Sequence, residues 1–207
     1  MKPLAIDLFC GIGGWADGFL AEGWDIVGFD IVKRKRKKYP GTFVQQDVLT
    51  LDGKRFASAV VILASPPCQA FSIAAVAYSD KLSSHRTGIA PFDMRLVMAA
   101  FRIAREAGVP LVLENVRGAI PLIGEPKGSF GPYFLWGNGV PPSLPYATRL
   151  DSWKGRHRSQ LLRAKIPFEL ARAVARFWKN PPPRLAFAGV RGRPAPYLSF
   201  IQEISVD

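Results

Sequence analysis

One cysteine in this chain has a setting that suits nucleophilic chemistry. Cys68 lies in residues 65–72 (SPPCQAFS), directly after the apolar run 60–64 (VVILA), so a strand is expected to end in a loop stiffened by two prolines. Open α/β proteins place their reactive groups at the carboxyl ends of such strands. We therefore predict that Cys68 is a presented nucleophile, although a lone cysteine is more often a small buried apolar residue.

A carboxylate follows another short apolar segment. Residues 111–116 (LVLENV) are typical of a strand that delivers Glu114 and Asn115 at its carboxyl end. Parallel strands align these ends, so Glu114 is expected on the same sheet edge as Cys68. There it could hydrogen-bond a substrate ring while the thiolate attacks. The alternative is that Glu114 is a helix-capping or surface acid.

A glycine-rich turn near the N-terminus indicates a nucleotide-type pocket. Residues 7–14 (DLFCGIGG) join an apolar strand to an expected helix, and glycines there let the backbone approach a ligand closely. The next two expected strands end at Asp30 and Asp47, and an acid in the first of these places commonly binds ribose hydroxyls. Three strand ends thus predict a site for an adenosine-type cofactor, although a glycine turn alone is equally compatible with a tight turn.

Five motifs occur in the order DLFCGIGG, FDI, QQDV, SPPCQAFS and LENV. In order and spacing, across residues 4–118, they resemble the cytosine-5 DNA methyltransferases. The chain is most similar to short, phage-type members, which share the Tyr-Pro of residues 39–40 and a closing helix near residues 163–171. The resemblance implies an α/β, doubly wound, Rossmann-like methyltransferase fold with a mostly parallel sheet. It also implies S-adenosylmethionine as cofactor and a reduced or absent target-recognition domain.

The resemblance implies a role for each motif residue. Cys68 would attack carbon 6 of cytosine, Glu114 would hold ring N3 and the exocyclic amine, and Asn115 would brace the loop at Pro67 and Cys68. Pro67 would also shape the wall near the sulfonium. The residues implied to bind the cofactor are Asp7, Phe9, Gly11, Ile12, Gly13, Gly14, Asp30, Ile31, Asp47, Val48 and Pro67.

The implied reaction explains why these residue types are needed. Carbon 5 of cytosine is a poor nucleophile until a thiolate adds at carbon 6, and covalent catalysis divides one hard step into two. A free cysteine, with a pKa of about 8.5, is only a few per cent thiolate at neutral pH, so nearby positive charge should help Cys68 to ionise. A protonated Glu114 would neutralise charge on the ring. The base that removes the carbon 5 proton cannot be identified from the sequence.

The charge of the chain favours a polyanionic partner. It has 28 Lys and Arg against 16 Asp and Glu, a net charge of +12, and we expect it to bind double-stranded DNA and to rotate the cytosine out of the stack. A solvated loop, a nuclear-targeting signal or a role at the cofactor end are alternatives for the basic run 33–38. The resemblance implies that Gln69 and Ser72 line the nucleic-acid side. The basic residues predicted to contact nucleic acid are Lys33, Arg34, Lys35, Arg36, Lys37, Lys38, Arg156 and Arg158.

The sequence departs from the family in one segment. Larger members carry a Gln-x-Arg-x-Arg motif that touches the target base, and it does not appear cleanly here. Arg158, beside Arg156, is the best substitute and is our candidate for the catalytic arginine, with Arg117 and Arg149 as other possible donors. Residues 117–153 are rich in Gly, Pro and aromatic residues and are predicted to form a compact loop module. Its aromatics could stack on bases or fill a miniature core.

Composition predicts one catalytic domain over residues 1–180, followed by a tail or added strand over 181–207. The chain has 207 residues, of which 48% are hydrophobic, and apolar spacing predicts helices over 93–107 and 168–178, the second closing one face of the sheet. The sequence has neither an 18-residue apolar run nor a signal peptide, so we expect a cytoplasmic monomer. Cys10 and Cys68 lie in separate turns, and a disulfide would inactivate the nucleophile, so we expect reduced thiols. Two cysteines without a histidine cluster predict no metal site.

The hypothesis from sequence is a DNA (cytosine-5)-methyltransferase. Three alternatives keep the same fold: an RNA (transfer RNA) cytosine-5 methyltransferase, a transferase that uses a modified S-adenosylmethionine, and a non-catalytic DNA-binding protein. A fourth, a Rossmann oxidoreductase, is disfavoured by the proline-cysteine loop.

Overall fold

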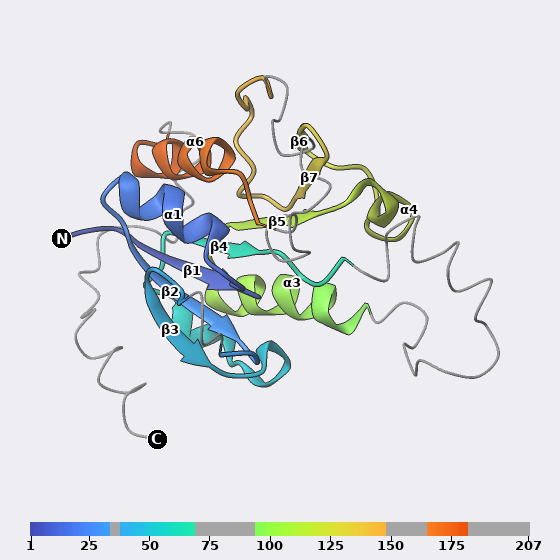
Figure 1. The fold of residues 1–207 in the computed structure, drawn as a ribbon. Helices are drawn as coiled ribbons and strands as arrows, with labels where there is room; N and C mark the ends of the chain where they lie inside the picture. The colour runs from blue at the N-terminus through green and yellow to red at the C-terminus, as the bar shows by residue number, and fades with distance from the viewer. Residues whose placement is uncertain (34–37, 69–93, 148–164, 182–207) are drawn as a thin grey trace.

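A seven-stranded sheet forms the centre of the molecule in the computed structural model, which describes residues 1–33, 38–68, 94–147 and 165–181 (Figure 1). The strands are β1 (Leu4–Leu8), β2 (Asp25–Asp30), β3 (Thr42–Gln45), β4 (Val61–Ala64), β5 (Leu111–Asn115), β6 (Gly128–Phe130) and β7 (Tyr133–Trp136). Their order across the sheet is β3-β2-β1-β4-β5-β7-β6.

The strands from β3 to β5 run parallel, and the β6–β7 pair joins the β5 edge antiparallel. The chain runs outward from β1 to β3 and then returns to place β4 on the other side of β1. The strand order therefore reverses between β1 and β4, which is the switch point of a doubly wound sheet. The predicted α/β, Rossmann-like methyltransferase fold with a mostly parallel sheet is confirmed.

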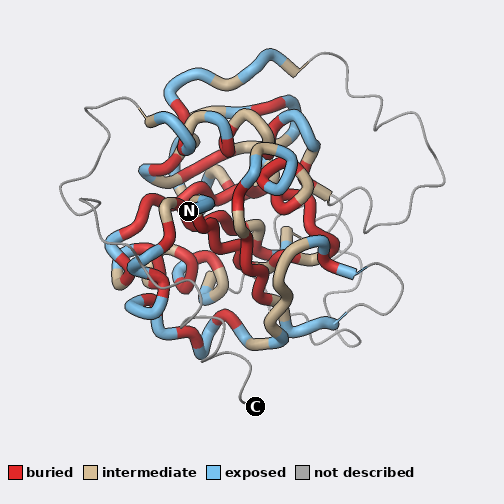
Figure 2. The backbone as a smooth tube through the Cα atoms, turned by 90° about the vertical axis from the view of Figure 1, so that its left-hand side faces the viewer, coloured by how far each residue is buried: buried red, intermediate tan, exposed pale blue. Residues whose placement is uncertain are grey.

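Helices cover both faces of this sheet (Figure 1). On one face lie α1 (Gly14–Ala21) and α6 (Phe168–Lys179), and on the other lie α3 (Arg95–Ala107) and the short 3-10 helices η1 (Val48–Thr50) and η2 (Gly53–Phe56). Strands β1, β4 and β5 are buried at every position, as the red central segments of Figure 2 show. Burial on both faces explains why these strands are mostly apolar without alternation, with Asp7, Glu114 and Asn115 as their buried polar residues.

Two helices predicted from apolar spacing are confirmed. The segment expected over 93–107 forms α3, which ends where Gly108 takes a left-handed φ of +66°. The segment expected over 168–178 forms α6, whose buried residues recur on one side and pack toward the sheet and α1. These residues are Leu170, Ala171, Val174, Ala175 and Trp178.

Helices α1 and α6 approach each other closely because α1 presents glycines. A Cβ added at Gly18 would lie 2.5 Å from the backbone nitrogen of Arg172, and one at Gly14 would lie 2.5 Å from that of Ile166. Ion pairs flank this contact: Glu22 Oε1 accepts from Arg172 Nε at 2.6 Å and from Arg176 Nε at 2.8 Å. The late helix is therefore packed directly on the helix that follows the glycine turn.

Gly18→Ala is expected to destabilise the fold. The added methyl group would overlap backbone atoms of α6, which cannot move away without separating the helices, so a loss of about 1–3 kcal/mol is expected. Urea unfolding followed by circular dichroism would measure it. Ala16→Gly, on the same helix, is the matched control for a change of one methyl group. A Gly18→Ala protein as stable as the wild type would contradict the close packing.

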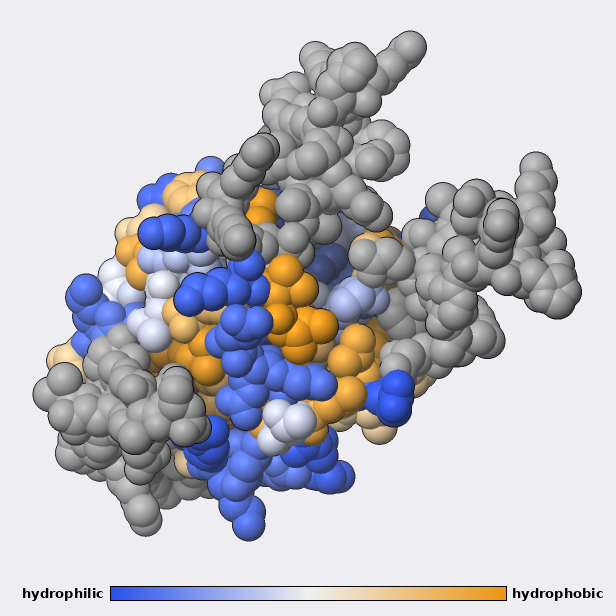
Figure 3. All heavy atoms as spheres, turned by 60° about the horizontal axis from the view of Figure 1, so that its bottom comes forward, coloured by the Kyte–Doolittle hydropathy of each residue, from blue (hydrophilic) through white to orange (hydrophobic). Residues whose placement is uncertain are grey.

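The polar residues of α3 tie this helix to η1 and η2. Arg102 Nη1 donates to the Leu51 carbonyl and to Glu106 Oε2, both at 2.9 Å, and the same Glu106 oxygen accepts from the Gly53 backbone N–H at 2.9 Å. Hydrophilic residues form a band between apolar patches on the face that Figure 3 brings forward. The α3 layer is thus held to the loops after β3 by hydrogen bonds as well as by its apolar side.

Residues 117–147 fold along the free edge of β5. After η4 (Arg117–Ala119) and α4 (Ile120–Ile123), the β6–β7 hairpin extends the main sheet, with Glu114 opposite Leu135. Leu135 and Trp136 are buried in the core. The segment therefore adds strands to the sheet where the sequence indicated loops. The limits 117–153, 1–180 and 181–207 stay predictions, since 148–164 and 182–207 lie outside the described residues.

Candidate active site

The carboxyl ends of four neighbouring strands bring the predicted residues to one edge of the sheet. Parallel pairing aligns Leu8 of β1 with Phe29 of β2 and with Ala64 of β4, and Ala64 with Leu113 of β5. The glycine turn, Asp30, the segment 65–68 and Glu114 each lie just beyond these positions. The register thus brings together residues that are up to about a hundred positions apart in sequence.

The charge of Glu114 influences the ionisation of the Cys68 thiol. Cys68 is half-buried and does not belong to the apolar core on either face of the sheet, and burial followed by the charge of Glu114 raises the pKa of its thiol. Burial raises the pKa of Glu114 to about 7, a rise that a hydrogen bond with Ser65 opposes. Because two negative charges at these places disfavour each other, protonation of Glu114 makes ionisation of Cys68 easier.

Ser65 and Trp15 support Glu114 and were not singled out in the sequence. Trp15 Nε1 donates to Ser65 Oγ at 3.0 Å, and Ser65 in turn hydrogen-bonds the Glu114 carboxyl. Trp15 is 2% exposed, so the chain of contacts begins in the core. In the sequence, only the position of Ser65 directly before the two prolines could have indicated its role. Nothing distinguishes Trp15 from other apolar residues of its helix.

Asn115 braces the loop that carries Cys68. Its Nδ2 donates to the Pro66 carbonyl at 3.2 Å, and its Oδ1 accepts from the Val116 backbone N–H at 2.8 Å. Asn115 is 1% exposed, whereas Pro67 is exposed. The contact falls one residue before the Pro67–Cys68 pair that the resemblance implied, and it links the ends of β4 and β5.

The glycine turn after β1 has an unusual backbone. Phe9, Gly11 and Gly13 have φ values of +60°, +53° and +80°, and a left-handed conformation is strained for a phenylalanine. The Gly11 backbone N–H donates to Asp30 Oδ2 at 3.0 Å, and Asp30 Oδ1 accepts from the Val32 N–H at 2.9 Å. Each carboxylate oxygen keeps lone pairs free for a further donor such as a hydroxyl.

The outer side of this turn fits a ligand. A Cβ built at Gly11 would meet only the Phe9 carbonyl oxygen, at 3.9 Å, so the space beside it is open. Ile31 and Val32, directly after Asp30, are 63% and 45% exposed. Exposed apolar side chains next to a carboxylate with free lone pairs suit an adenosine. Its ring would pack on the apolar residues, and its ribose would hydrogen-bond the acid.

Other predicted cofactor residues are enclosed by the protein itself. Gly13 lies under Pro40 and Gly14 under Ile166, so packing alone accounts for these glycines. Val48 is 2% exposed and Asp7 is fully buried. Ile12 is also buried, and Asp47 is exposed with its carboxylate capping η1 through the Leu49 N–H. The cofactor contacts of these residues stay predictions.

Tyr133 is a polar group beside Glu114 that the motifs did not indicate. It begins β7, which pairs with β5, and its hydroxyl donates to the Lys165 carbonyl at 3.4 Å. Burial, followed by the charge of Glu114, raises the pKa of Tyr133. Only the aromatic character of the segment pointed to it, and pairing of β7 with β5 is not visible in the local sequence.

The nucleic-acid residues fall mostly outside the described part of the chain. These are Arg34, Lys35, Arg36, Lys37, Gln69, Ser72, Arg149, Arg156 and Arg158. Lys33, Lys38 and Arg117 are described and exposed. Within the described ranges, no group of His, Cys, Asp and Glu could hold a metal ion, and no helix has both the length and the apolar character to cross a membrane.

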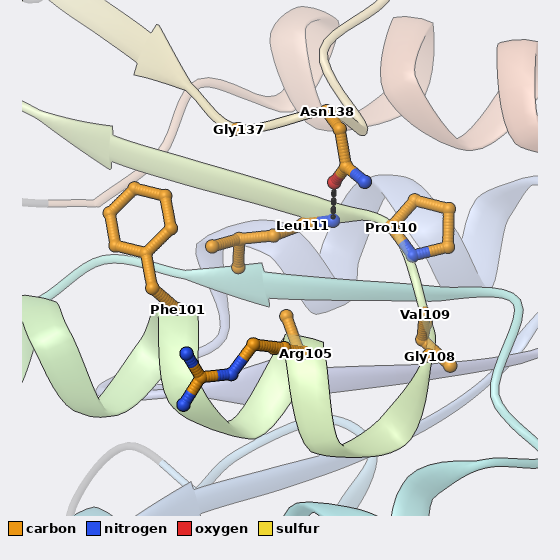
Figure 4. A pocket seen from close by; sticks show the side chains of 9 residues that line it. Phe101, Arg105, Gly108, Val109, Pro110, Leu111, Gly137 and Asn138 are labelled. Atoms are coloured by element: carbon orange, nitrogen blue, oxygen red, sulfur yellow. Dashed lines mark hydrogen bonds between the residues drawn. The ribbon is translucent and has the colours of Figure 1, made fainter.

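A cavity of about 420 Å³ lies at the opposite end of β5 (Figure 4). It is lined by the end of α3, by Pro110 and Leu111, and by Gly137 and Asn138. The Asn138 side chain accepts a hydrogen bond from the Leu111 N–H at 2.9 Å. Its position at the amino end of the sheet separates it from Cys68, Glu114 and the glycine turn.

Comparison with known proteins places the first half of the chain in a family. The family described as C-5 cytosine-specific DNA methylase matches residues 4–122. These residues contain all five motifs and every strand from β1 to β5. No curated protein matches the chain.

Solved structures resemble part of the chain. A protein described as a DNA modification methyltransferase from a prophage (E. coli) is 24% identical with a TM-score of 0.40, over 57% of this chain and 33% of its own. For DNMT2 of Spodoptera frugiperda the values are 21%, 0.41, 59% and 38%, and for Dnmt2 of S. pombe they are 18%, 0.37, 58% and 36%. The matched region thus spans between 33% and 38% of the length of each of these proteins.

Proposed function

Because this chain belongs to the C-5 cytosine-specific DNA methylase family, we propose that it methylates carbon 5 of a cytosine in double-stranded DNA. C-5 cytosine methyltransferases use S-adenosylmethionine, which supplies the methyl group. The observation that supports the proposal most is the pairing of Cys68 with a buried Glu114 of raised pKa at the carboxyl edge of the sheet. A nucleophile beside a proton donor is what addition to a cytosine ring requires.

The proposed reaction begins with bond formation between Cys68 Sγ and carbon 6 of the ring. The electron pair of the carbon 5–carbon 6 double bond makes carbon 5 nucleophilic, while Glu114, protonated, hydrogen-bonds N3 and limits charge on the ring. Carbon 5 would then take the methyl group of S-adenosylmethionine, and the bond between that methyl group and the sulfonium sulfur would break to leave a neutral thioether. Loss of its proton and departure of the thiolate restore the double bond and free the enzyme.

On this proposal, Phe9, Gly11, Asp30 and Ile31 hold the cofactor on the open side of the turn. Asp30 accepts from the ribose hydroxyls, since both of its oxygens keep free lone pairs while they bind backbone N–H groups. Ile31 covers the adenine with a side chain that is 63% exposed. Burying it against a ring contributes about 25 cal/mol for each Å² of apolar surface removed from water.

The net charge of +12 supports a nucleic-acid substrate. Lysines and arginines that neutralise phosphates release counterions, so binding of this chain to DNA is expected to weaken steeply with salt. Rotation of the cytosine out of the duplex costs a few kcal/mol, which contacts in the pocket offset.

A covalent trap tests the proposal. The full chain would be incubated with S-adenosylmethionine and with duplex DNA in which 5-fluorocytosine replaces cytosine. Fluorine at carbon 5 cannot leave as a proton does, so the reaction should stop at an adduct that survives denaturation and that maps to the Cys68 peptide. Omission of S-adenosylmethionine and the Cys68→Ala variant are the controls, and neither should give the stable adduct.

The same assay separates the competing functions. An adduct with 5-fluorocytidine RNA and none with DNA would assign the enzyme to RNA. Absence of adduct with both polymers, in a protein that binds S-adenosylmethionine, would reject the covalent mechanism and favour a non-catalytic DNA-binding protein. Mass spectrometry of cytosine from unmodified DNA would identify the transferred group, and a mass other than that of methyl would indicate a modified donor.

A further inference from the structure

A buried acid and a buried phenol meet beneath the glycine turn. Tyr39 Oη donates to Asp7 Oδ2 at 3.0 Å; Asp7 is fully buried and Tyr39 is 9% exposed. The second carboxyl oxygen, Oδ1, has no hydrogen-bond partner among the described residues. Burial of a carboxyl oxygen without a hydrogen-bond partner disfavours folding. The surrounding layer is otherwise made of residues such as Ala5, Trp15 and Phe19.

Tyr39 and Pro40 pack against the inner side of the turn. A Cβ added at Gly13 would lie 2.3 Å from Pro40 Cδ, and one at Gly28 would lie 2.5 Å from Tyr39 Cζ and 2.8 Å from Cys10 Sγ. Gly13 ends the turn with a left-handed φ of +80° and precedes α1. Both glycines are therefore required by the approach of Tyr39 and Pro40, which fill the space behind the turn.

The turn thus has two unlike sides. Its outer side is open at Gly11 and is held by Asp30, whereas its inner side is filled by Tyr39, which is fixed to Asp7. Asp7 precedes the turn by two residues and is fully enclosed, so it cannot reach a ligand on the outer side without moving the turn itself. Among the described residues, the Asp7 carboxyl has one hydrogen-bond partner, Tyr39, which supports the turn.

We propose that Tyr39 is a positioning residue for the cofactor, and that its hydrogen bond to buried Asp7 holds the glycine turn in the shape that binds S-adenosylmethionine. This inference rests on the proposed function and assigns Asp7 a supporting role in place of direct contact. The hydroxyl fixes the depth at which the phenol ring sits behind Gly13 and Gly28. Loss of the hydrogen bond lets the ring and the turn shift together, while the apolar packing remains.

The charges around the pair determine how the support depends on pH. Burial raises the pKa of Asp7 to about 8; the Tyr39 hydrogen bond opposes the rise and the charge of Asp30 adds to it. The pKa of Tyr39 is raised well above its usual value by burial, then by the charge of Asp7, and further by the charges of Cys10 in the turn and of Asp17 in α1, which pairs with Lys165. At neutral pH Asp7 is therefore mostly protonated, and the pair is held by a hydrogen bond between neutral groups.

The direction of the pH effect follows from this shift. The folded-state pKa of Asp7 lies above the ordinary value of 3.8, so its contribution to stability is complete at acid pH and is lost as the pH rises toward about 8. Ionisation above about 8 places a second charge near Asp30, whose carboxylate holds the Gly11 N–H. Affinity for the cofactor is expected to fall through that range.

Two variants separate the hydrogen bond from the charge. Tyr39→Phe keeps the ring and removes the hydroxyl, so the dissociation constant of S-adenosylmethionine at neutral pH should rise between about threefold and tenfold. Because that hydroxyl lowers the pKa of Asp7, the midpoint of the affinity loss should move to higher pH. Asp7→Asn keeps an acceptor for Tyr39 but cannot ionise. Its affinity for S-adenosylmethionine should therefore stay near the wild-type value at neutral pH and should not fall as the pH rises through about 8.

Calorimetric titration of the full chain with S-adenosylmethionine, from below to above pH 8, measures these effects. Titration of the ligand's own amino group is common to all variants and cancels in the comparison. Circular dichroism at each pH verifies folding, and Tyr146→Phe, which changes a 90% exposed tyrosine outside the turn, is the matched control and should keep the wild-type midpoint.

The outcomes distinguish this inference from the proposed function. If the wild type binds S-adenosylmethionine and both variants keep its affinity and its midpoint, Tyr39 has no positioning role and the proposed function stands. If Tyr39→Phe loses affinity without any change in midpoint, the effect is one of general packing and the inference fails. If the wild type does not bind S-adenosylmethionine at any pH, the proposed function itself is rejected and the inference falls with it.

Discussion

Replacing Cys68 with alanine is expected to abolish methyl transfer, with a loss of at least about 10⁴-fold, the scale on which removal of a covalent nucleophile is felt. Without the sulfur, carbon 6 of the ring has no nucleophile and carbon 5 stays unreactive. Cys68 lies half-buried at the edge of the sheet and is not part of the apolar core on either face, so its truncation should cost little stability. Transfer of tritiated methyl groups from S-adenosylmethionine to DNA measures the effect.

Binding measurements are the control for this variant. Cys68→Ala should keep the wild-type affinity for DNA and for S-adenosylmethionine, because neither depends on the covalent bond. Cys68→Ser should be as inactive as alanine, since a hydroxyl is far less ionised than a thiol at neutral pH. Retention of more than a few per cent of activity in either variant would show that Cys68 is not the nucleophile.

Glu114→Gln is expected to lower the rate of methyl transfer by about 10²- to 10⁴-fold, the range for loss of a general acid. Glutamine keeps the size of the side chain and can still contact the ring amine, but it cannot lend a proton to N3. Its removal of the negative charge should also lower the pKa of Cys68, since the charge of Glu114 raises it. Single-turnover transfer measures the first effect and the rate of thiol alkylation measures the second.

The pH profile gives this prediction its sharpest form. With a Glu114 pKa of about 7 and a Cys68 pKa above its usual range, the wild-type rate should rise to about pH 7 and fall only where the thiol titrates. In the productive state Glu114 is protonated and Cys68 is ionised. Between the two pKa values, this state is a small and constant fraction of the protein. In Glu114→Gln the limb near pH 7 should disappear and the residual rate should follow the thiolate alone. A limb that persists near pH 7 in the variant would remove Glu114 from the mechanism.

The parts of the fold that follow from local pattern could be predicted from the sequence. Strands buried on both faces are mostly apolar in sequence. Asp30, the segment 65–68 and Glu114 show where three of these strands end. Parallel pairing then places those residues together, which is why motifs far apart in sequence indicated one site.

The parts that depend on distant contacts could not be predicted. The glycines at 13 and 14 suggested a ligand, but their immediate neighbours are Pro40 and Ile166, and Ile166 is more than a hundred residues away. Residues 128–136 have the glycine and proline content of a loop, yet β7 finds its partner in β5 and completes the sheet. Ser65 and Trp15, which support Glu114, and Tyr133, whose pKa the charge of Glu114 raises, became visible only through such pairings.

The packing of α6 on α1 has a consequence for how the protein is made. The first turn of α1, which follows the glycine turn, is backed by Ile166 and by a helix that is synthesised after most of the chain. During translation, the motifs of the first 118 residues leave the ribosome well before the segment that completes their surroundings. A nascent chain therefore cannot acquire a finished binding turn early, and competence should appear only after residue 179 has emerged.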